Sequence, residues 1–320
     1  MNTTQTAEHE VEPHEPHWLS RSAFQIVVFL LFFTEIALWA VLQSGASLWF
    51  AVPIVLIAGH LMHGSSVAFH EASHGLLRRS RLVNEVDGLI LGTLSFMSFS
   101  LYRAAHQMHH MHLSTERDEE LWPFIHPDKP RWLRILAAFL ELTMGLFFLP
   151  LLFLRIFLRA GSPIRSRKVR RRIWKEYALM ALVWTAIGFA VSHWHVGKYF
   201  LWMYALPAFL AGNLQSWRKY IEHVGLTGST VNSSTRSIVA RGLGGKLVAF
   251  TLLHEPYHGV HHLHMALPHA ELPARASVLA PQTQAEMHPF ANYRQALGHL
   301  LRSLADPRVG AQWRKASHQQ

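Results

Sequence analysis

Three groups of closely spaced histidines are the residues of this chain best suited to chemistry. They lie in the sequences HEASH, HQMHH and HGVHH. On a helix, residues three and four positions apart share one face, so each group directs two or three imidazoles toward a common point. That is how a helix presents ligands to a metal ion, and we therefore predict a metal centre. Its candidate ligands are His70, His74, His106, His109, His110, His258, His261 and His262.

Most of the other histidines need no ligand role. With 24 histidines in 320 residues, one HxxHH motif could arise by chance, but two of them together with an HxxxH motif are far harder to obtain by accident. His60 and His63 lie in an apolar segment and are predicted to be core residues, with a place beside a substrate tunnel as the alternative. Histidines in polar stretches are predicted to be solvated: His9, His14, His17, His288, His299 and His318.

The composition points to a membrane protein. Half of the residues are hydrophobic and 16% are charged, whereas soluble domains carry about a quarter charged residues. A helix needs about 20 residues to cross a hydrocarbon core of about 30 Å. Four apolar segments approach or reach that length: Phe24–Leu42, Leu48–Phe69, Tyr177–Ser192 and Tyr199–Ser216.

Two further apolar segments are predicted not to span. Leu89–Leu101 is too short and fits a re-entrant or interfacial segment. Trp132–Leu158 is long enough, but the strongly basic segment Arg155–Arg172 prefers the cytoplasmic face. We therefore predict that Trp132–Leu158 lies along the interface, bent at Pro150, with Glu141 at headgroup depth.

These assignments define a fold and an orientation. We predict an all-α membrane protein with four transmembrane helices in two hairpins, interfacial helices and a cytosolic cap lined by histidines. The hairpins turn outside at Gln43–Ser47 and His193–Lys198, so both termini and all three histidine groups are cytoplasmic. Residues 1–20 form a polar tail without the features of a signal peptide, residues 21–285 form the membrane domain, and residues 286–320 form a polar C-terminal segment.

Several classes of function are disfavoured. The net charge of +10 could suggest nucleic acid, but the arginines lie beside apolar segments, so anionic lipid headgroups are the better partner and we predict no nucleic acid. The chain has no cysteine, which excludes an iron–sulfur site held by its own thiolates. Haem pairs need histidines at matched depth on facing spans, and ion transport needs ionisable residues within the spans; neither pattern fits.

The order and context of the three groups resemble the membrane-bound fatty acid desaturases and their hydroxylase relatives. The run Tyr257-His258-Gly259-Val260-His261-His262, followed by Pro268 and Leu272-Pro273, is similar to that family's third histidine box. The segment Arg218–Gly225 resembles its lone Glu-His element, which makes His223 a ninth ligand. The resemblance covers roughly Phe24 to Leu279.

The resemblance implies a reaction and its cofactors. Imidazole suits several transition metals, and the resemblance selects two non-haem iron ions, with O2 as co-substrate. The expected function is an O2-dependent oxidoreductase that introduces a double bond into a fatty acyl chain of a membrane lipid or related acyl substrate. The alternative is a di-iron hydroxylase or ketolase of an alkyl, fatty acyl or carotenoid substrate. The first histidine group, HEASH, has the HxxxH spacing, which favours the acyl-lipid desaturase and hydroxylase branch of the family.

The resemblance also implies partners. The chain carries no HPGG cytochrome b5 motif, so electrons must come from an external ferredoxin, rubredoxin or cytochrome-type donor with its reductase.

Acidic residues near the boxes complete the prediction. Glu71, Glu222 and Glu255 are adjacent to a candidate ligand or to His254, and could accept the second ring N–H of a ligating imidazole. Asp118, Glu119 and Glu120 follow the second box and are predicted to form a solvated acidic loop. His254 is the substitute ligand should His223 fail.

Overall fold

The protein is all-helical in the computed structural model, which describes residues 18–316. Among these residues there is no strand, and one isolated bridge joins Ile238 and Phe290. The predicted all-α class is confirmed. The N-terminal residues 1–17, which make up most of the predicted polar tail, and His318 lie outside the described residues.

The helices have the following bounds. In chain order they are α1 (Trp18–Arg21), α2 (Ala23–Gln43), η1 (Leu48–Phe50), α3 (Ala51–His74), α4 (Arg81–Leu94), α5 (Phe99–Met111), η2 (Glu119–Leu121), α6 (Arg131–Thr143), α7 (Gly145–Leu158), α8 (Arg167–His193), α9 (Gly197–Phe200), η3 (Leu201–Ala205), α10 (Leu206–His223), α11 (Val231–Ser234), α12 (Gly242–Thr251), α13 (His258–Leu263), η4 (His269–Leu279), α14 (Tyr293–Leu301) and α15 (Gln312–Ala316).

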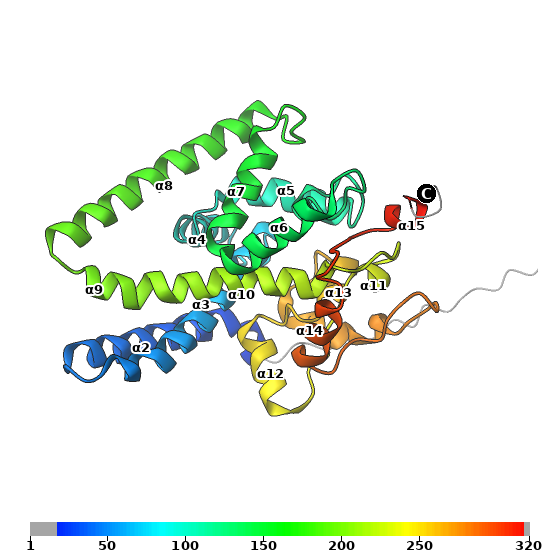
Figure 1. The fold of residues 1–320 in the computed structure, drawn as a ribbon. Helices are drawn as coiled ribbons and strands as arrows, with labels where there is room; N and C mark the ends of the chain where they lie inside the picture. Colours follow the sequence, from blue (N-terminus) through cyan, green and yellow to red (C-terminus); the bar gives the residue numbers. More distant parts are fainter. Residues whose placement is uncertain (1–17, 317–320) are drawn as a thin grey trace, which may run out of the picture.

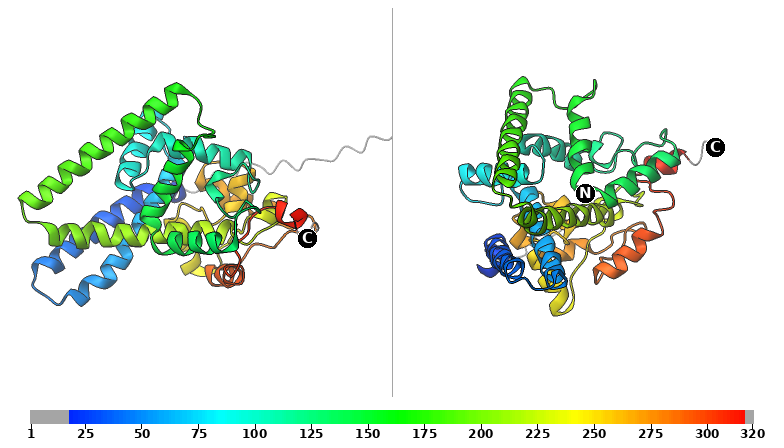
Figure 2. Two further views of the ribbon diagram at one scale, coloured as in Figure 1. Left: turned by 45° about the horizontal axis from the view of Figure 1, so that its top comes forward. Right: turned by 60° about the vertical axis from the view of Figure 1, so that its left-hand side comes forward.

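Two long helical hairpins form one end of the molecule. The first joins α2 to α3, and the second joins α8 to the continuous helical run α9–η3–α10. Figures 1 and 2 show both hairpin turns at the same end, with the segments after α10 gathered at the other. α10 packs against α3 and α7, whereas α8 diverges from α10 beyond the turn (Figure 1). The helix reversals of the two predicted hairpins are therefore present, and the membrane crossing of all four helices stays a prediction.

Within residues 18–316, three helical segments are long and apolar enough to cross a membrane: Ala23–Gln43, Leu48–His74 and Arg167–His193. They contain three of the four predicted spans. The fourth predicted span, Tyr199–Ser216, is helical but is not among the three. Its polar residues Asn213 and Gln215 and the charged residues that follow lower its apolar character.

The segment predicted to be re-entrant contains a sharp bend. α4 and α5 meet at 99°, across a break at residues 95–98, and the pair qualifies as a broken span or a re-entrant loop. Phe96, in the break, has a φ of 57°, a conformation that bulky residues rarely adopt. The bend directs α5, which carries the second histidine box, back toward the core.

The helical break in this region lies at Met144, between α6 and α7, and not at Pro150, where a bend is predicted. Pro150 lies inside α7. The cause is tertiary. The N–H of Gly145 donates to Oδ1 of Asn213 on α10 at 2.8 Å, and a Cβ on Gly212 would lie 2.5 Å from the Cα of Leu146. The backbones of α7 and α10 therefore touch at this point, and the break permits it.

Glu141, which is predicted to lie at headgroup depth, faces the protein interior and not the headgroups. Its side chain is fully buried, where it forms an ion pair with Lys219 and accepts a hydrogen bond from Tyr220 at 3.1 Å. The pair joins α6 to α10 inside a cluster of buried apolar residues that includes Phe124 and Ile221.

Part of the predicted polar C-terminal segment belongs to this core. Ala296, Leu300 and Val309 are fully buried in the same apolar cluster as Phe124. The indole N–H of Trp313 donates to the carbonyl oxygen of Phe124 at 2.8 Å. The described residues after 285 thus contribute to the apolar core beside α6 and α10.

Replacing Glu141 by alanine tests the role of the buried ion pair. The change leaves the Lys219 ammonium buried without a counter-charge, so we expect the free energy of unfolding to fall by about 3–5 kcal/mol. The measurement is the thermal midpoint of the detergent-solubilised protein. The double variant Glu141→Leu/Lys219→Met removes both charges and should recover most of the loss. An unchanged midpoint in Glu141→Ala would contradict the assignment.

Candidate metal centre

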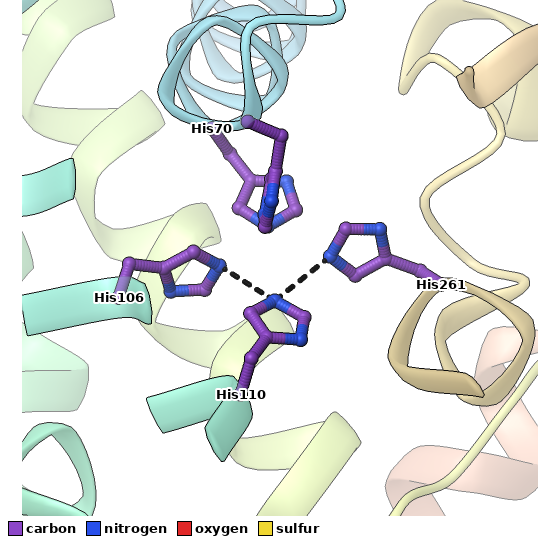
Figure 3. Close-up of side chains that lie close together, drawn as sticks. His70, His106, His110 and His261 are labelled. Carbon is purple, nitrogen blue, oxygen red and sulfur yellow. Dashed lines mark hydrogen bonds between the residues drawn. The ribbon is translucent and has the colours of Figure 1, made fainter. Parts of the chain in front are cut away.

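Five histidines from three elements converge in one cluster. His70 and His74 come from the last turns of α3, His106 and His110 from α5, and His261 from α13. Each offers a ring nitrogen, and these five atoms lie within 4.8 Å of one another. Figure 3 shows four of the rings pointing toward a common centre, with Nε2 of His110 at 3.1 Å from Nε2 of both His106 and His261. We call this the five-histidine cluster.

Four further histidines form a second cluster beside the first. They are His109 on α5, His223 at the end of α10, and His258 and His262 on α13. Nε2 of His258 lies 2.9 Å from Nε2 of His223 and 3.0 Å from Nε2 of His262. The ligand atoms of His109, His223 and His262 lie within 4.8 Å of one another. We call this the four-histidine cluster.

Hydrogen bonds among the rings alone do not explain this packing. A ring nitrogen of neutral imidazole either donates one hydrogen bond or accepts one. Nε2 of His110 nevertheless has two nitrogen neighbours at 3.1 Å, and Nε2 of His258 has two within 3.0 Å. One contact of each pair stays unsatisfied in the protein alone. A cation that accepts every lone pair resolves the conflict, so both clusters fit a metal ion.

The closest nitrogen pairs in both clusters have the spacing of ligands that share one metal ion. For a metal–nitrogen bond of about 2.1 Å, neighbouring ligand atoms lie about 3.0–3.4 Å apart. The closest pairs here lie at 2.9–3.1 Å.

Buried carboxylates orient three of the ligand rings. Nδ1 of His106 lies 3.0 Å from Oε2 of Glu120, and Nδ1 of His109 lies 2.9 Å from both oxygens of Asp118. Nδ1 of His258 lies 2.9 Å from Oε1 of Glu255. A carboxylate that accepts a hydrogen bond from Nδ1–H keeps the proton on Nδ1 and leaves the Nε2 lone pair free to face a metal.

The predicted solvated acidic loop is therefore wrong. Asp118, Glu119 and Glu120 are all buried, because the chain after α5 folds back over the histidines of α5. Glu119 forms ion pairs with Arg155 at 3.0 Å and Arg159 at 2.6 Å. The available sequence signal was the run of three acids within ten residues of a histidine box, in a chain poor in charge.

Glu255 touches both clusters. Its Oε1 accepts a hydrogen bond from Nδ1 of His258, and its Oε2 lies 3.5 Å from Nδ1 of His70. Arg218 donates through one guanidinium nitrogen to Glu255 at 2.9 Å and to Glu222 at 2.8 and 3.0 Å. Burial alone would raise the pKa of Glu255, but the nearby His261 and Arg218 outweigh it and hold this pKa well below its usual range.

The other two predicted carboxylates differ from Glu255. Glu222 lies 3.7 Å from Nδ1 of His258 and is held mainly by Arg218. Glu71 is fully buried and has an oxygen near the ligand atoms of His70 and Glu255, but the structure gives it no hydrogen bond to a candidate ligand within the described residues.

The remaining histidines near the boxes lie outside both clusters. His254, the predicted substitute ligand, stacks on His269 at 6.0 Å between ring centroids instead of facing the clusters. Burial lowers the pKa of His254 to about 4, so this ring is neutral near pH 7. His60 contacts the hydroxyl of Thr251 at 2.8 Å, and His63 is buried in the core. His112 and His264 cap the ends of α5 and α13.

A mostly apolar cavity of about 380 Å³ leads to the two clusters. It lies between α3, α7 and α10, and the α4–α5 break forms part of its wall. Apolar side chains such as Leu31, Ile90 and Phe153 line its length, and His70, His106 and His258 lie on its wall. Several wall residues, including Ile90 and Leu94, are also exposed on the apolar surface of the helices.

Comparison with known proteins yields one family. Residues 47–293 match the family model described as fatty acid desaturase. A search of curated proteins finds no match. The matched stretch contains all nine histidines of the two clusters.

Replacing His110 by alanine tests the five-histidine cluster. The change removes a ring that contacts both His106 and His261, so we expect bound metal per protein to fall by at least half. The measurement is elemental mass spectrometry of the purified protein after loading with Fe(II). His112→Ala, two residues further along the chain and outside the clusters, is the matched control and should bind as the unaltered protein does. Equal metal content in the two variants would contradict the assignment.

Proposed function

The chain belongs to the fatty acid desaturase family, and on that premise we propose that it introduces a double bond into a fatty acyl chain in an O2-dependent reaction. The family and the apolar helices make it a membrane oxidoreductase. The observation that supports the proposal is the cavity, because a space lined by apolar side chains ends at both histidine clusters.

Two non-haem iron ions are the cofactors that we propose. The five-histidine cluster would hold one and the four-histidine cluster the other. Bound iron would supply the O2 activation that removal of hydrogen from an unactivated C–H bond requires. Asp118, Glu120 and Glu255 would keep the proton of the ligating rings on Nδ1, so that Nε2 faces the metal.

The cavity walls would bind and aim the alkyl chain. Side chains of α2, α4 and α7 bury apolar surface along the cavity, which favours a hydrocarbon and excludes water near the clusters. Small residues on α10, among them Ala208 and Ala211, leave the space that the chain would fill. The methylene that passes closest to the clusters would be the one oxidised.

We propose the four-span topology with a cytoplasmic site. The run α9–η3–α10 would be the fourth span, with the polar residues of α10 turned toward the cavity and its neighbours, not toward lipid. Gln215, Arg218 and Glu222 line the cavity, which is consistent with this arrangement. The basic segment between α7 and α8 would face the cytoplasm, together with the histidine clusters.

A separate protein would deliver the electrons. We propose a ferredoxin, rubredoxin or cytochrome-type donor with an acidic docking face, served by its reductase. Arg155 and Arg159 supply the complementary charge, since each is about one third exposed and contacts Glu119. Glu119 is adjacent to Glu120, the carboxylate that contacts His106, so a donor bound there would lie close to the five-histidine cluster.

Lipid analysis tests the reaction. The intact chain is expressed with a ferredoxin and its reductase, and total lipids are analysed by gas chromatography–mass spectrometry. We expect new unsaturated acyl chains, absent with His109→Ala and present with His112→Ala. New oxygenated chains would replace the desaturase proposal by the hydroxylase or ketolase alternative. Unchanged lipids together with a metal-free purified protein would overturn the di-iron proposal.

Filling the cavity tests the substrate path separately from the metal. Ala211→Phe places a large ring in the cavity wall, so we expect product to fall at least tenfold with metal content unchanged. Ala186→Phe, on the exposed face of α8, is the matched control and should keep its activity. Full activity in Ala211→Phe would contradict the proposed path.

A further inference from the structure

A buried carboxylate on α8 holds the N-terminus of α5. Oε2 of Glu176 accepts hydrogen bonds from the hydroxyl of Ser98 at 2.6 Å and from the backbone N–H of Ser100 at 2.8 Å. Oε1 accepts from the hydroxyl of Ser100 at 2.5 Å. The side chain of Glu176 is 7% exposed. Glu176 lies on α8, 76 residues after Ser100 in the sequence.

These contacts complete the cap of α5. The first N–H groups of a helix have no partner inside the helix, and an acidic group there also stabilises the positive end of the helix dipole. Ser98 is the N-cap residue, and its hydroxyl oxygen accepts from the N–H of Leu101. Glu176 accepts hydrogen bonds from the backbone N–H and the hydroxyl of Ser100 and from the hydroxyl of Ser98. One carboxylate therefore fixes both the cap residue and the helix that follows it.

The position of α5 matters because it supplies a ligand to each cluster. α5 begins immediately after the 99° break, so the chain before it does not continue its axis. His110 is ten residues beyond Ser100, which is about 15 Å along a helix. A tilt of about 5° at the N-terminus would therefore move His110 by about 1.3 Å, whereas metal–ligand distances are defined to about 0.2 Å.

The other members of the network are more exposed. Arg172 donates to Oε1 of Glu176 at 3.0 Å and also pairs with Glu85, but its side chain is 45% exposed. Exposed ion pairs contribute little to stability. Arg103 of α5 pairs with the same Glu85 at 2.6 Å. The buried contacts of Glu176 with Ser98 and Ser100 thus form the strong part of the link between α8 and α5.

We propose that Glu176 is a positioning residue for the metal centre: through Ser98 and Ser100 it fixes α5 so that His106, His109 and His110 reach their clusters. Glu176 touches no candidate ligand, and its oxygens are occupied by the cap, so it acts through α5 alone. The inference rests on the proposed function only in taking the clusters to bind metal.

Three single variants of the full-length chain separate the link from its surroundings. Glu176→Gln keeps the size of the side chain but removes its charge and one acceptor oxygen. Ser100→Ala removes one hydrogen bond and leaves the backbone contact. Arg172→Gln, the matched control, removes the exposed ion pair and leaves every contact between Glu176 and α5.

The first measurement needs no metal. Hydrogen–deuterium exchange of the metal-free protein in detergent should be faster in the peptide covering residues 99–111 in Glu176→Gln, with exchange in α3 and α10 unchanged. Ser100→Ala should give a smaller increase and Arg172→Gln none. The second measurement is Fe(II) affinity, which we expect to fall about 10–100-fold in Glu176→Gln, as when a group that orients a ligand is removed.

The outcomes distinguish this proposal from the proposed function. Unaltered exchange in α5 and unaltered Fe(II) affinity in Glu176→Gln would overturn it, as would an equal loss in Arg172→Gln. Should Glu176→Gln fail to fold, Ser100→Ala carries the same test with a smaller expected effect. If the unaltered protein bound no metal, the di-iron proposal would be contradicted. The exchange measurement would still decide whether Glu176 holds α5 in place.

Discussion

The close approach of nine imidazole rings is the constraint on which the rest of the structure depends. Ring nitrogens that lie 2.9–3.1 Å apart repel one another when their lone pairs converge, and protonating them inside the protein would add charge repulsion. The protein must therefore fix which nitrogen of each ring carries its proton. Asp118, Glu120 and Glu255 do this for His109, His106 and His258, and a bound metal would use the lone pairs that converge.

The helices meet the constraint by bringing their ends together. α3 ends directly after its histidine box, because Gly75 adopts a φ of 79° and closes the last turn with a hydrogen bond to Ala72. α10 ends at His223, and α13 begins at His258. α5 starts from a sharp bend, and Glu176 of α8 anchors its N-terminus. The arrangement of the site is thus a consequence of where each helix begins or ends.

Local spacing was enough to predict eight of the histidines, and the family resemblance added His223; the structure brings all nine together. It was also enough to predict the two hairpins, since long apolar segments separated by short turns have few alternatives. It could not predict Asp118 and Glu120 beside the rings, because their role depends on a loop that folds back across α5, and the acids alone resemble a solvated loop. The break at Met144 instead of Pro150 has the same origin: Gly212 and Asn213 lie 68 or more residues away in sequence, yet they set where α7 begins.

The low apolar character of α10 follows from the site it helps to build. A lipid-facing helix would gain nothing from Arg218, Lys219 and Glu222, and burying these charges unpaired would cost several kcal/mol each. Here Arg218 pairs with Glu222 and Glu255, and Lys219 pairs with Glu141. Arg218 thus balances the carboxylate that orients His258, and Lys219 balances Glu141, while the apolar residues earlier in α10 line the cavity. One helix therefore joins the hydrocarbon space to the charged surroundings of the clusters. For that reason its N-terminal half is apolar and its C-terminal half carries buried charges.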